Sequence, residues 1–468
     1  MMGRRSILIC AGLFLAGGAV GQVGATRYFD TWHFNDSLTI YFNGTATPTL
    51  DPHTTPPHSG YSNLSISDPF TGSLIFYVNG GEVLDGTGSV VPHGSLGSLG
   101  AFACLPHPGD PDRFYLFLGG DSIYYSVFDR TLNGGLGDID PGEHRIALWD
   151  RLDGTTAFTN SAGTRHTLVC HALFTNDFYL FHVTANNGLE PTPEVITTGP
   201  ILSGSLPPGG IKVAPGTDRL ALVDPIHEEQ LCMFSLDRNT AQIEHLFTYH
   251  WRDSLSSFEF APASDLFYIG DNDGVDGSLY QLNMGSTDTA QISASAERLD
   301  VGQLGNLGWR PILQLAPNGV VYYFYDIPVE DVATNHLQGI LQPDVPGAGC
   351  QVDLEALDMQ QPWAWWRWWP WVYWPVHNAV GIAEESSGPR IAVHPMPMRD
   401  AGWLSLETGD PDRIEWLDMT GRIVRVQQGM PHRDGWRLDA SGLASGTYLV
   451  RPMEGDQVIG TVPVMVER

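Results

Sequence analysis

The residues that could do chemistry in this chain do not fall into a complete catalytic motif. The sequence holds no Gly-x-Ser-x-Gly elbow, no phosphate-binding loop, no His-Glu-x-x-His zinc helix and no Cys-x-x-Cys pair. His227-Glu228-Glu229 begins like a zinc helix, but no second histidine follows at the required spacing. We interpret that stretch as an exposed hairpin and assign no catalytic residue from the sequence.

Asp271, Asp273 and Asp276 form the metal candidate. They lie in an acidic stretch with glycines at 274 and 277, and oxygen ligands at alternate positions with a glycine for the sharp turn suit calcium. The bidentate glutamate that completes an EF-hand loop is missing, and such turns are common in acidic β-proteins. A calcium loop and a plain hairpin therefore both stay open. We expect no other cofactor.

Seven tryptophans gather between residues 363 and 374, where Arg367 is the single charge. Aromatic faces stack on the apolar faces of sugar rings, and exposed aromatic patches mark binding sites. The candidate ligand contacts are Trp365, Trp366, Trp368, Trp369 and Trp371. Two alternatives stay open: the segment packs as a strap on a neighbouring domain, with Arg367 stacked on indole rings, or it is a poorly ordered tail.

The charge balance limits the partners. The chain carries 53 acidic and 24 basic residues, for a net charge of −29, and Lys212 is its sole lysine. A strongly anionic surface repels nucleic acid and anionic membranes. We therefore expect no nucleic-acid partner.

The first residues indicate export. Arg4 and Arg5 precede an apolar run from Ile7 to Val20, and small residues follow, which is typical of a signal peptide over residues 1–21. The run is too short to span a bilayer comfortably, and no later segment reaches about 18 uninterrupted apolar residues. We expect no transmembrane anchor in the mature chain.

The cysteines leave their pairing open. Four remain in the mature chain, at spacings that fit neither a zinc site nor a small disulfide framework; they are Cys104, Cys170, Cys232 and Cys350. One or two disulfides and four separate buried thiols are both compatible with an exported protein.

The elements that must position these residues are short strands. From Tyr28 to about Tyr325, runs of four to six aromatic or β-branched residues alternate with Gly, Asp, Asn and Pro, which predicts an all-β domain. One phrase, an apolar residue followed by Ala-Pro, a polar turn and an apolar run, recurs at Pro215, Pro262 and Pro317. Related copies precede Phe114 and Leu74, and a weaker one runs from Thr167 to Phe181.

These copies make six units of roughly 40–60 residues, the size of a four-stranded propeller blade. The opening stretch, Tyr28 to Phe42, must also pair somewhere, and closing the ring against the last blade is the common solution. We therefore predict a six- or seven-bladed β-propeller, with an array of β-sandwiches as the alternative.

Many phrases of residues 28–355 resemble a family of exported Bacteroidetes-type propellers that has no settled biochemical activity. They include Trp32-His33-Phe34, Tyr124-Tyr125-Ser126-Val127-Phe128-Asp129, Leu279-Tyr280-Gln281-Leu282 and Gln314-Leu315-Ala316-Pro317-Asn318-Gly319. The third unit lacks the Asn-Gly and Trp stretch of that pattern, so we expect a degenerate blade there.

The last 79 residues resemble the type A C-terminal sorting domain of the type IX secretion system. The resemblance lies in a strand, an Asp-x-x-Gly-Arg turn and a Leu-x-x-Gly-x-Tyr strand. It places the sorting motif on Pro395, Pro397, Asp418, Gly421, Arg422, Leu443, Gly446 and Tyr448. Met396 stands where the family has asparagine, and Pro463 lies inside the final strand, Val462 to Val466, which implies an edge position.

The expected organisation is a signal peptide at 1–21, a propeller at 22–380 ending in the Trp-rich segment, a linker at 381–389 and a small antiparallel, immunoglobulin-like β-sandwich at 390–468. The resemblance implies passage through the periplasm, export by the type IX machinery, and a secreted or outer-surface location.

Three functions stay open. The first is a non-enzymatic scaffold for adhesion or for binding surface glycans or another extracellular ligand. The second is an extracellular hydrolase or lactonase at the propeller channel, and the third is a structural component of a surface layer or matrix. Since fold does not imply function, the residues lining the channel must decide between them.

Overall fold

The chain divides into two compact units, one within Ala25–Val380 and one within Gly381–Arg468. The computed structural model describes residues 27–34, 38–42, 47–52, 63–69, 71–97, 100–119, 122–150, 152–202, 210–224, 230–251, 254–272, 277–299, 311–325, 336–359, 391–394, 398–399, 401–406, 411–417, 422–428, 431–432, 435–455, 457–459 and 461–466. The predicted signal peptide, the Trp-rich segment and the linker lie outside the described residues.

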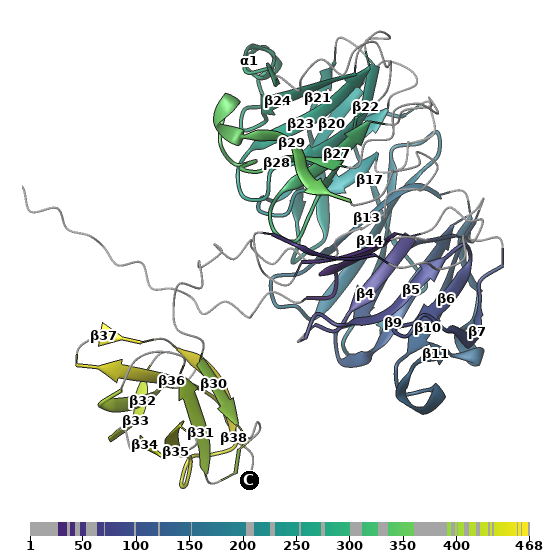
Figure 1. Cartoon of the computed structure of the whole chain (residues 1–468). Coiled ribbons are helices and arrows are strands. Elements are labelled where there is room, and N and C mark those ends of the chain that lie inside the picture. The colour runs from purple at the N-terminus through teal and green to yellow at the C-terminus, as the bar shows by residue number, and fades with distance from the viewer. Residues whose placement is uncertain are drawn as a thin grey trace, which may run out of the picture. The chain divides into compact units, whose positions relative to one another are not determined.

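In the described part of the larger unit, the strands form seven antiparallel sheets in sequence order, which we number as blades 1 to 7 (Figure 1). Blade 1 contains β1 (Thr31–Phe34), β2 (Leu38–Tyr41) and β3 (Thr49–Pro52). Blade 2 contains β4 (Asn63–Ser67), β5 (Leu74–Asn79), β6 (Glu82–Asp85) and β7 (Val90–Ser95). Blade 3 contains β8 (Gly100–His107), β9 (Asp110–Gly119), β10 (Ser122–Asp129), β11 (Asp138–Ile139) and β12 (Ile146–Asp150).

Blades 4 to 7 repeat this arrangement. Blade 4 contains β13 (Leu152–Thr159), β14 (Arg165–Ala172), β15 (Asp177–Thr184), β16 (Gly188–Leu189) and β17 (Glu194–Thr197). Blade 5 contains β18 (Ile211–Val213), β19 (Arg219–Asp224), β20 (Gln230–Asp237) and β21 (Gln242–His250). Blade 6 contains β22 (Ser254–Phe260), β23 (Leu266–Asn272), β24 (Gly277–Asn283), the helix α1 (Thr289–Ala294) and β25 (Glu297–Leu299). Blade 7 contains β26 (Pro311–Leu315), β27 (Val321–Tyr325), β28 (His336–Ile340) and β29 (Val352–Asp358).

The apolar core shows that these sheets form a ring. Separate buried clusters join blade 3 to 4, blade 4 to 5, blade 5 to 6 and blade 6 to 7. A further cluster contains side chains of blades 7, 1, 2 and 3. The contacts between blades therefore close into a cycle, which makes the fold a β-propeller and not an array of sandwiches.

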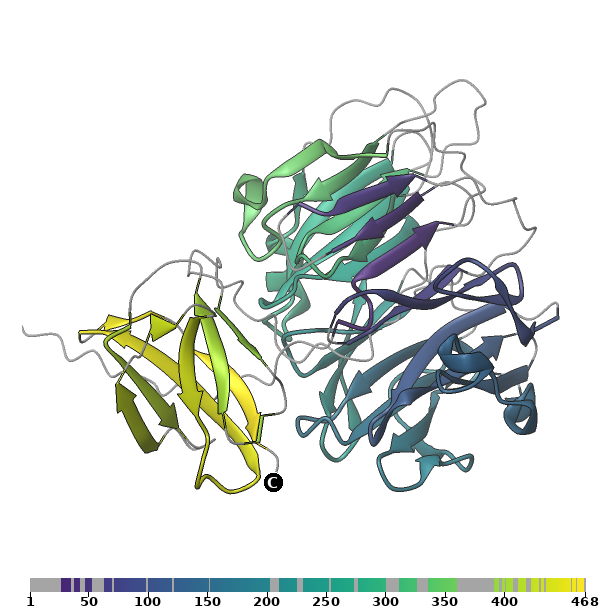
Figure 2. The ribbon, with the colours of Figure 1, turned by 60° about the horizontal axis from the view of Figure 1, so that its bottom comes forward.

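Blade 1 closes the ring by packing aromatic rings against blade 7. The buried indole of Trp32 lies 4.8 Å from the ring of Phe42 and 6.2 Å from that of Tyr322 in β27. Figure 2 shows the purple strands of blade 1 beside the green strands of the last blade. The expected closure against the last blade is confirmed, and its hydrophobic burial stabilises the ring.

The sequence prediction for blade 4 was wrong by one strand, because it took the second and third strands of the blade for the first and second. Thr167 and Phe178 lie in β14 and β15, the second and third strands, so the hairpin equivalent to the other copies is β13–β14. Its turn uses Asn160, whose side-chain oxygen accepts from the Thr164 amide at 2.9 Å and the Arg165 amide at 3.1 Å. Because asparagine shapes this turn, the Ala-Pro phrase is absent. The blade itself is a full five-stranded sheet and is not degenerate.

A repeated device locks neighbouring blades together. In blades 3 to 7, the connection between the third strand and the outer strand reaches back to the preceding blade. Asp138 accepts from both the amide and the ring of His93, and the side-chain oxygen of Asn239 accepts from the Ser161 amide and hydroxyl. The Gly347 amide donates to Gln281 at 2.7 Å. The other two contacts are Gly188 beside Tyr115 and Ser293 with Tyr249.

The smaller unit is a two-sheet antiparallel sandwich, as expected. One sheet contains β30 (Ile391–His394), β31 (Ala401–Leu406), β34 (Pro431–His432) and β35 (Gly435–Asp439). The other contains β32 (Arg413–Leu417), β33 (Ile423–Gln428), β36 (Gly446–Glu454), β37 (Gln457–Val458) and β38 (Val462–Val466). Buried Leu404, Trp416, Leu438 and Val464 belong to one core between them. The predicted final strand is β38, whose ladder pairs with β36 and places Pro463 opposite Leu449.

The pairing that the sequence left open is settled for four cysteines, which are separate buried thiols: Cys104, Cys170, Cys232 and Cys350. Burial raises the pKa of the Cys104, Cys170 and Cys350 thiols above the ordinary value, because desolvation disfavours the thiolate. The thiols therefore act as small apolar core groups.

Candidate functional site at the innermost strands

The chemistry-bearing residues that the ring brings together lie on its first strands. The first strands of neighbouring blades contact one another, as β1 contacts β4, β13 contacts β18 and β22 contacts β26. Each is the first strand of its sheet and leaves one edge unpaired within that sheet. An open edge presents amide and carbonyl groups that need partners. Polar side chains on these strands can satisfy them.

Lys212, the sole lysine of the chain, lies on β18 and joins three blades. Its Nζ donates to Glu259 Oε2 on β22 at 2.7 Å and to the carbonyl of Leu313 on β26 at 3.1 Å. The same ammonium lies 5.7 Å from the ring centre of Phe258, within cation–π range. One side chain of blade 5 thus contacts both blade 6 and blade 7.

Glu259 uses both carboxylate oxygens inside the ring. Oε2 accepts from the Leu315 amide at 3.0 Å as well as from Lys212, and Oε1 accepts from the Phe260 amide at 3.0 Å. Its side chain is only 6% exposed, and that of Lys212 is 15% exposed. A buried ion pair must recover the free energy lost on desolvation through additional hydrogen bonds, and the two amides supply them.

The edge of β26 is satisfied from blades 5 and 6. The amide of Leu313 donates to the hydroxyl of Ser257 at 3.2 Å, while its carbonyl accepts from Lys212. The next group along this edge, the Leu315 amide, is held by Glu259. The cluster therefore acts as a polar tie across three innermost strands.

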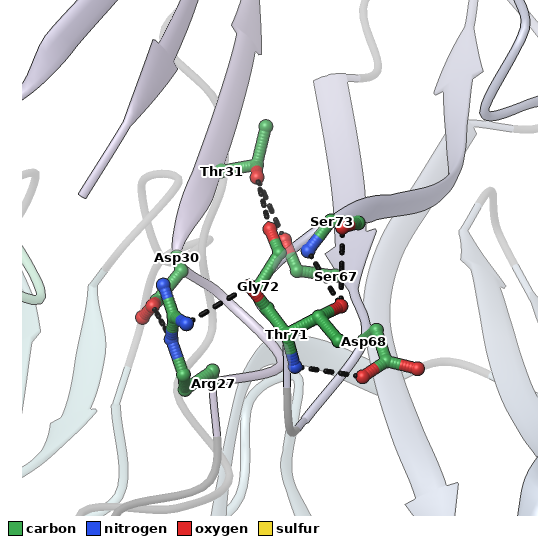
Figure 3. A network of polar contacts seen from close by, with 8 residues as sticks. All are labelled: Arg27, Asp30, Thr31, Ser67, Asp68, Thr71, Gly72 and Ser73. Carbon is green, nitrogen blue, oxygen red and sulfur yellow. Dashed lines mark hydrogen bonds and ion pairs between the residues drawn. The ribbon is translucent and has the colours of Figure 1, made fainter. Parts of the chain in front are cut away.

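A second tie, whose ion pair is more exposed, joins blades 1 and 2 (Figure 3). Ser67 donates its hydroxyl to Thr31 Oγ1 at 2.8 Å, and Ser65 donates to the carbonyl of Thr31. At the adjoining turn, Arg27 bonds Asp30 and donates to the carbonyl of Thr71 at 2.8 Å. The start of blade 1 is thereby held to the first turn of blade 2.

Gly72 leaves room for that arginine. Its φ of +72° favours glycine, and a Cβ atom there would lie 2.4 Å from Arg27 Nη2. Burial raises the pKa of Asp30, while the Arg27 guanidinium acts in the opposite direction. This contact between blades 1 and 2 therefore combines the charge of Arg27 with a tight turn at Gly72.

Blade 4 holds the most strongly perturbed histidines. Burial lowers the pKa of His166 to about 4, and nearby His107 lowers it further; burial also lowers the pKa of His171 to about 4. The ring of His166 shares a 2.7 Å hydrogen bond with Thr159. These rings are neutral near pH 7, when they act as packed polar groups.

The candidates from the sequence fall in different places. Asp271 lies buried at the end of β23 opposite Ser278, whereas Asp273, Asp276, the five candidate tryptophans and His227 lie outside the described residues. Within those residues, no group of three or more His, Cys, Asp or Glu side chains suits a metal ion. The calcium question therefore stays a prediction.

The sorting-motif residues are partly described. Leu443 is buried, and Tyr448 lies on β36 with its ring 6.3 Å from Trp416 and its hydroxyl donating to the carbonyl of Ala444. Gly446 begins β36, and Arg422 is exposed just before β33. Pro395, Pro397, Asp418 and Gly421 lie outside the described residues.

Sequence reasoning missed Lys212 and Glu259 as partners. The sequence offers one signal for this position: nearly all basic residues of the chain are arginines, and Lys212 is its sole lysine. An ammonium is a compact point charge with rotatable donors, whereas a guanidinium is a larger planar fork. The position therefore favours lysine because the charge must fit between three strands.

Comparisons with known proteins yield structural likeness only. No family model matches the chain, and no curated protein does. Among solved structures, Sqt1 from Chaetomium thermophilum has a TM-score of 0.36 at 12% identity, covering 69% of this chain and 86% of its own. The β-propeller domain of Cps50 (Swd1) from Myceliophteria thermophila has a TM-score of 0.35 at 11% identity, covering 64% and 93%.

The periplasmic gluconolactonase PpgL of Pseudomonas aeruginosa has a TM-score of 0.36 at 12% identity, covering 54% of this chain and 74% of its own. Among the described residues, no helix has the length and apolarity needed to cross a bilayer.

Proposed function

We propose that this chain is an exported, non-enzymatic β-propeller scaffold that binds an extracellular ligand, and that its C-terminal sandwich is the module that directs its secretion. The observation that carries the scaffold proposal is the use made of Lys212 and Glu259. Both belong to innermost strands, and their polar atoms hold backbone groups of neighbouring blades.

That arrangement supports a rigid ring more than an active centre. A general base or nucleophile must keep an atom within hydrogen-bonding reach of a substrate. Here the carboxylate of Glu259 already accepts three hydrogen bonds from the protein, and its removal would leave an ammonium and two amides buried without their partner. The pair therefore serves to hold three blades in register.

The export proposal rests on the motif order and on the autonomy of the sandwich. The sandwich has its own core, with Trp416 and Leu404 fully buried, and forms a compact unit separate from the propeller. A transferable secretion signal must fold without its cargo, and a separate core meets that requirement.

Deletion of residues 390–468, expressed in a bacterium with a type IX system, tests the export proposal. We expect the truncated propeller to accumulate in the periplasm while the full chain reaches the surface or the medium. As the matched gain-of-function control, residues 381–468 fused to a periplasmic reporter should carry the reporter outside. Normal appearance of the truncated chain in the medium would refute the assignment.

The scaffold proposal is tested by replacing Glu259 with glutamine. Glu259→Gln should lower the stability of the propeller and leave ligand binding intact below its melting temperature. If the purified chain hydrolyses esters or lactones and this substitution abolishes turnover in the folded protein, the hydrolase alternative replaces the scaffold.

A further inference from the structure

Among the described tryptophans of the propeller, Trp149 is exposed although its ring packs on other aromatic residues. Trp32 and Trp251 are buried at 0% and 4% exposure, whereas Trp149 on β12 is 38% exposed. A large apolar ring costs free energy when it is left in water. An exposed tryptophan supported from behind is therefore a natural candidate for a binding contact.

Two rings of the next blade support Trp149. Its ring lies 5.4 Å from that of Tyr179, at an interplanar angle of 45°, and 6.3 Å from that of Phe181. Tyr179 pairs across strands with Val195, which is 49% exposed. Trp149, Tyr179 and Val195, which we call the aromatic shelf, thus cover the outer seam between blades 3 and 4.

One short polar pair lies on the face of blade 4 that carries Tyr179 and Val195. Thr197 donates its hydroxyl to Asp177 Oδ1. Side chains two apart on a strand share a face, so Asp177 shares the face of Tyr179, and Thr197 shares that of Val195. The carboxylate of Asp177 has a second oxygen that can accept a hydrogen bond from a ligand hydroxyl.

An independent observation on the same blade points to a ligand. Phe174, in the turn that leads into β15, is 65% exposed and has a φ of +60°. That conformation is strained for a bulky residue. Strained positions cluster at sites of ligand contact, and this one carries an exposed aromatic ring near the start of the strand that supplies Tyr179.

We infer that the aromatic shelf is a binding site for a neutral sugar unit of an extracellular glycan. An indole face matches the apolar face of a pyranose ring, and the carboxylate of Asp177 accepts hydrogen bonds from its hydroxyls. The net charge of −29 disfavours uronates, sulfated sugars and phosphates. This inference rests on the proposed scaffold function and names the ligand class.

The test is affinity gel electrophoresis of the full chain with soluble polysaccharides. Laminarin, xylan and mannan serve as neutral probes, and polygalacturonate and heparin serve as anionic ones. We expect at least one neutral probe to retard the chain, and Trp149→Ala to weaken that binding about tenfold or more. Trp149→Phe should retain part of it, because a ring remains. Val426→Ala, an exposed apolar position on the sandwich, is the matched control.

Three outcomes would overturn the inference: no retardation by any neutral probe, retardation by the anionic probes alone, or equal binding by wild type and a folded Trp149→Ala variant. In the last case the chain still binds a glycan, so the scaffold proposal survives and only the shelf is wrong. Circular dichroism of each variant establishes that lost binding does not reflect unfolding.

Discussion

The propeller and the sandwich each bury a glutamate, but they pair it in different ways. In the propeller, Glu259 is joined to a lysine from a neighbouring blade and to the backbone of a third. In the sandwich, Glu415 on β32 faces Arg451 directly across the strand pair, with contacts of 2.6 and 3.1 Å, and Arg413 lies two residues away on its own strand.

The difference shows what each polar contact stabilises. The pair in the propeller links residues 47 positions apart in different sheets, so it fixes how sheets stand relative to one another. The pair in the sandwich joins neighbours in one sheet that already share backbone hydrogen bonds, and both arginines are about one-third exposed. The propeller pair therefore helps to fix the arrangement of the blades, whereas the sandwich pair adds a surface contact to a sheet that is already formed.

The largest effect should follow from breaking the propeller pair. Glu259→Ala leaves Lys212 without its carboxylate and the amides of Phe260 and Leu315 without acceptors, so we expect the free energy of unfolding to fall by about 3–5 kcal/mol. Urea unfolding measures this loss. Glu355→Ala, at an exposed position of blade 7, is the control, and an equal loss in both variants would show that the pair contributes nothing.

The two units should also differ in their response to acid. The pKa of His166 is about 4 in the folded propeller against an ordinary 6.5. Between these values the unfolded chain binds a proton that the folded chain does not, so stability falls as the pH drops through this window, by about 3 kcal/mol for His166.

His166→Gln should remove that part of the pH dependence. Unfolding free energies measured between pH 7 and 4 give the slope, with exposed His250→Gln as the control.

The sandwich should lose stability at lower pH than the propeller. Hydrogen bonding to Arg451, with that to Arg413, lowers the pKa of Glu415, so its contribution is present above about pH 4.5 and is lost as the pH falls further. If hydrogen exchange shows that the sandwich opens before the propeller as the pH is lowered, the expected order is wrong.

A smaller loss should follow from disturbing one contact between blades. Gly188 has a φ of +66°, and a Cβ atom there would lie 2.3 Å from Tyr115 Oη, whereas Gly163, at +69°, has open space around it. Gly163→Ala should cost about 1 kcal/mol for the left-handed backbone alone, and Gly188→Ala about 2–3 kcal/mol because the blade contact must shift as well. Thermal unfolding compares the two variants, and identical losses of stability would show that the contact between Gly188 and Tyr115 does not hold the blades together.

The smallest effect should come from the sandwich pair. Glu415→Ala should lower stability by about 1 kcal/mol, since the arginines keep access to water. Hydrogen exchange across β32 and β36 reports it locally, with exposed Glu454→Ala as the control. A loss as large as that of Glu259→Ala would remove the distinction between the two pairs.

The local pattern of the chain was sufficient for much of the fold. Short β-branched and aromatic runs between turn residues predicted the strands, because alternation and turn chemistry act over a few residues. The recurrent Ala-Pro phrase predicted the blades wherever proline makes the first turn. It misplaced blade 4, where Asn160 makes that turn with its side chain, since two different residues can shape the same bend.

The contacts of the candidate site could not be predicted from the local sequence pattern. The composition singled out Lys212 as the sole lysine, but only the closed ring brings it within 2.7 Å of Glu259 and within reach of Leu313, 101 positions further along. The aromatic shelf likewise exists only because blades 3 and 4 stand side by side, so that Trp149 meets Tyr179. Local propensities determine strands and turns, whereas contacts between distant strands depend on how the sheets pack, which no short stretch of sequence encodes.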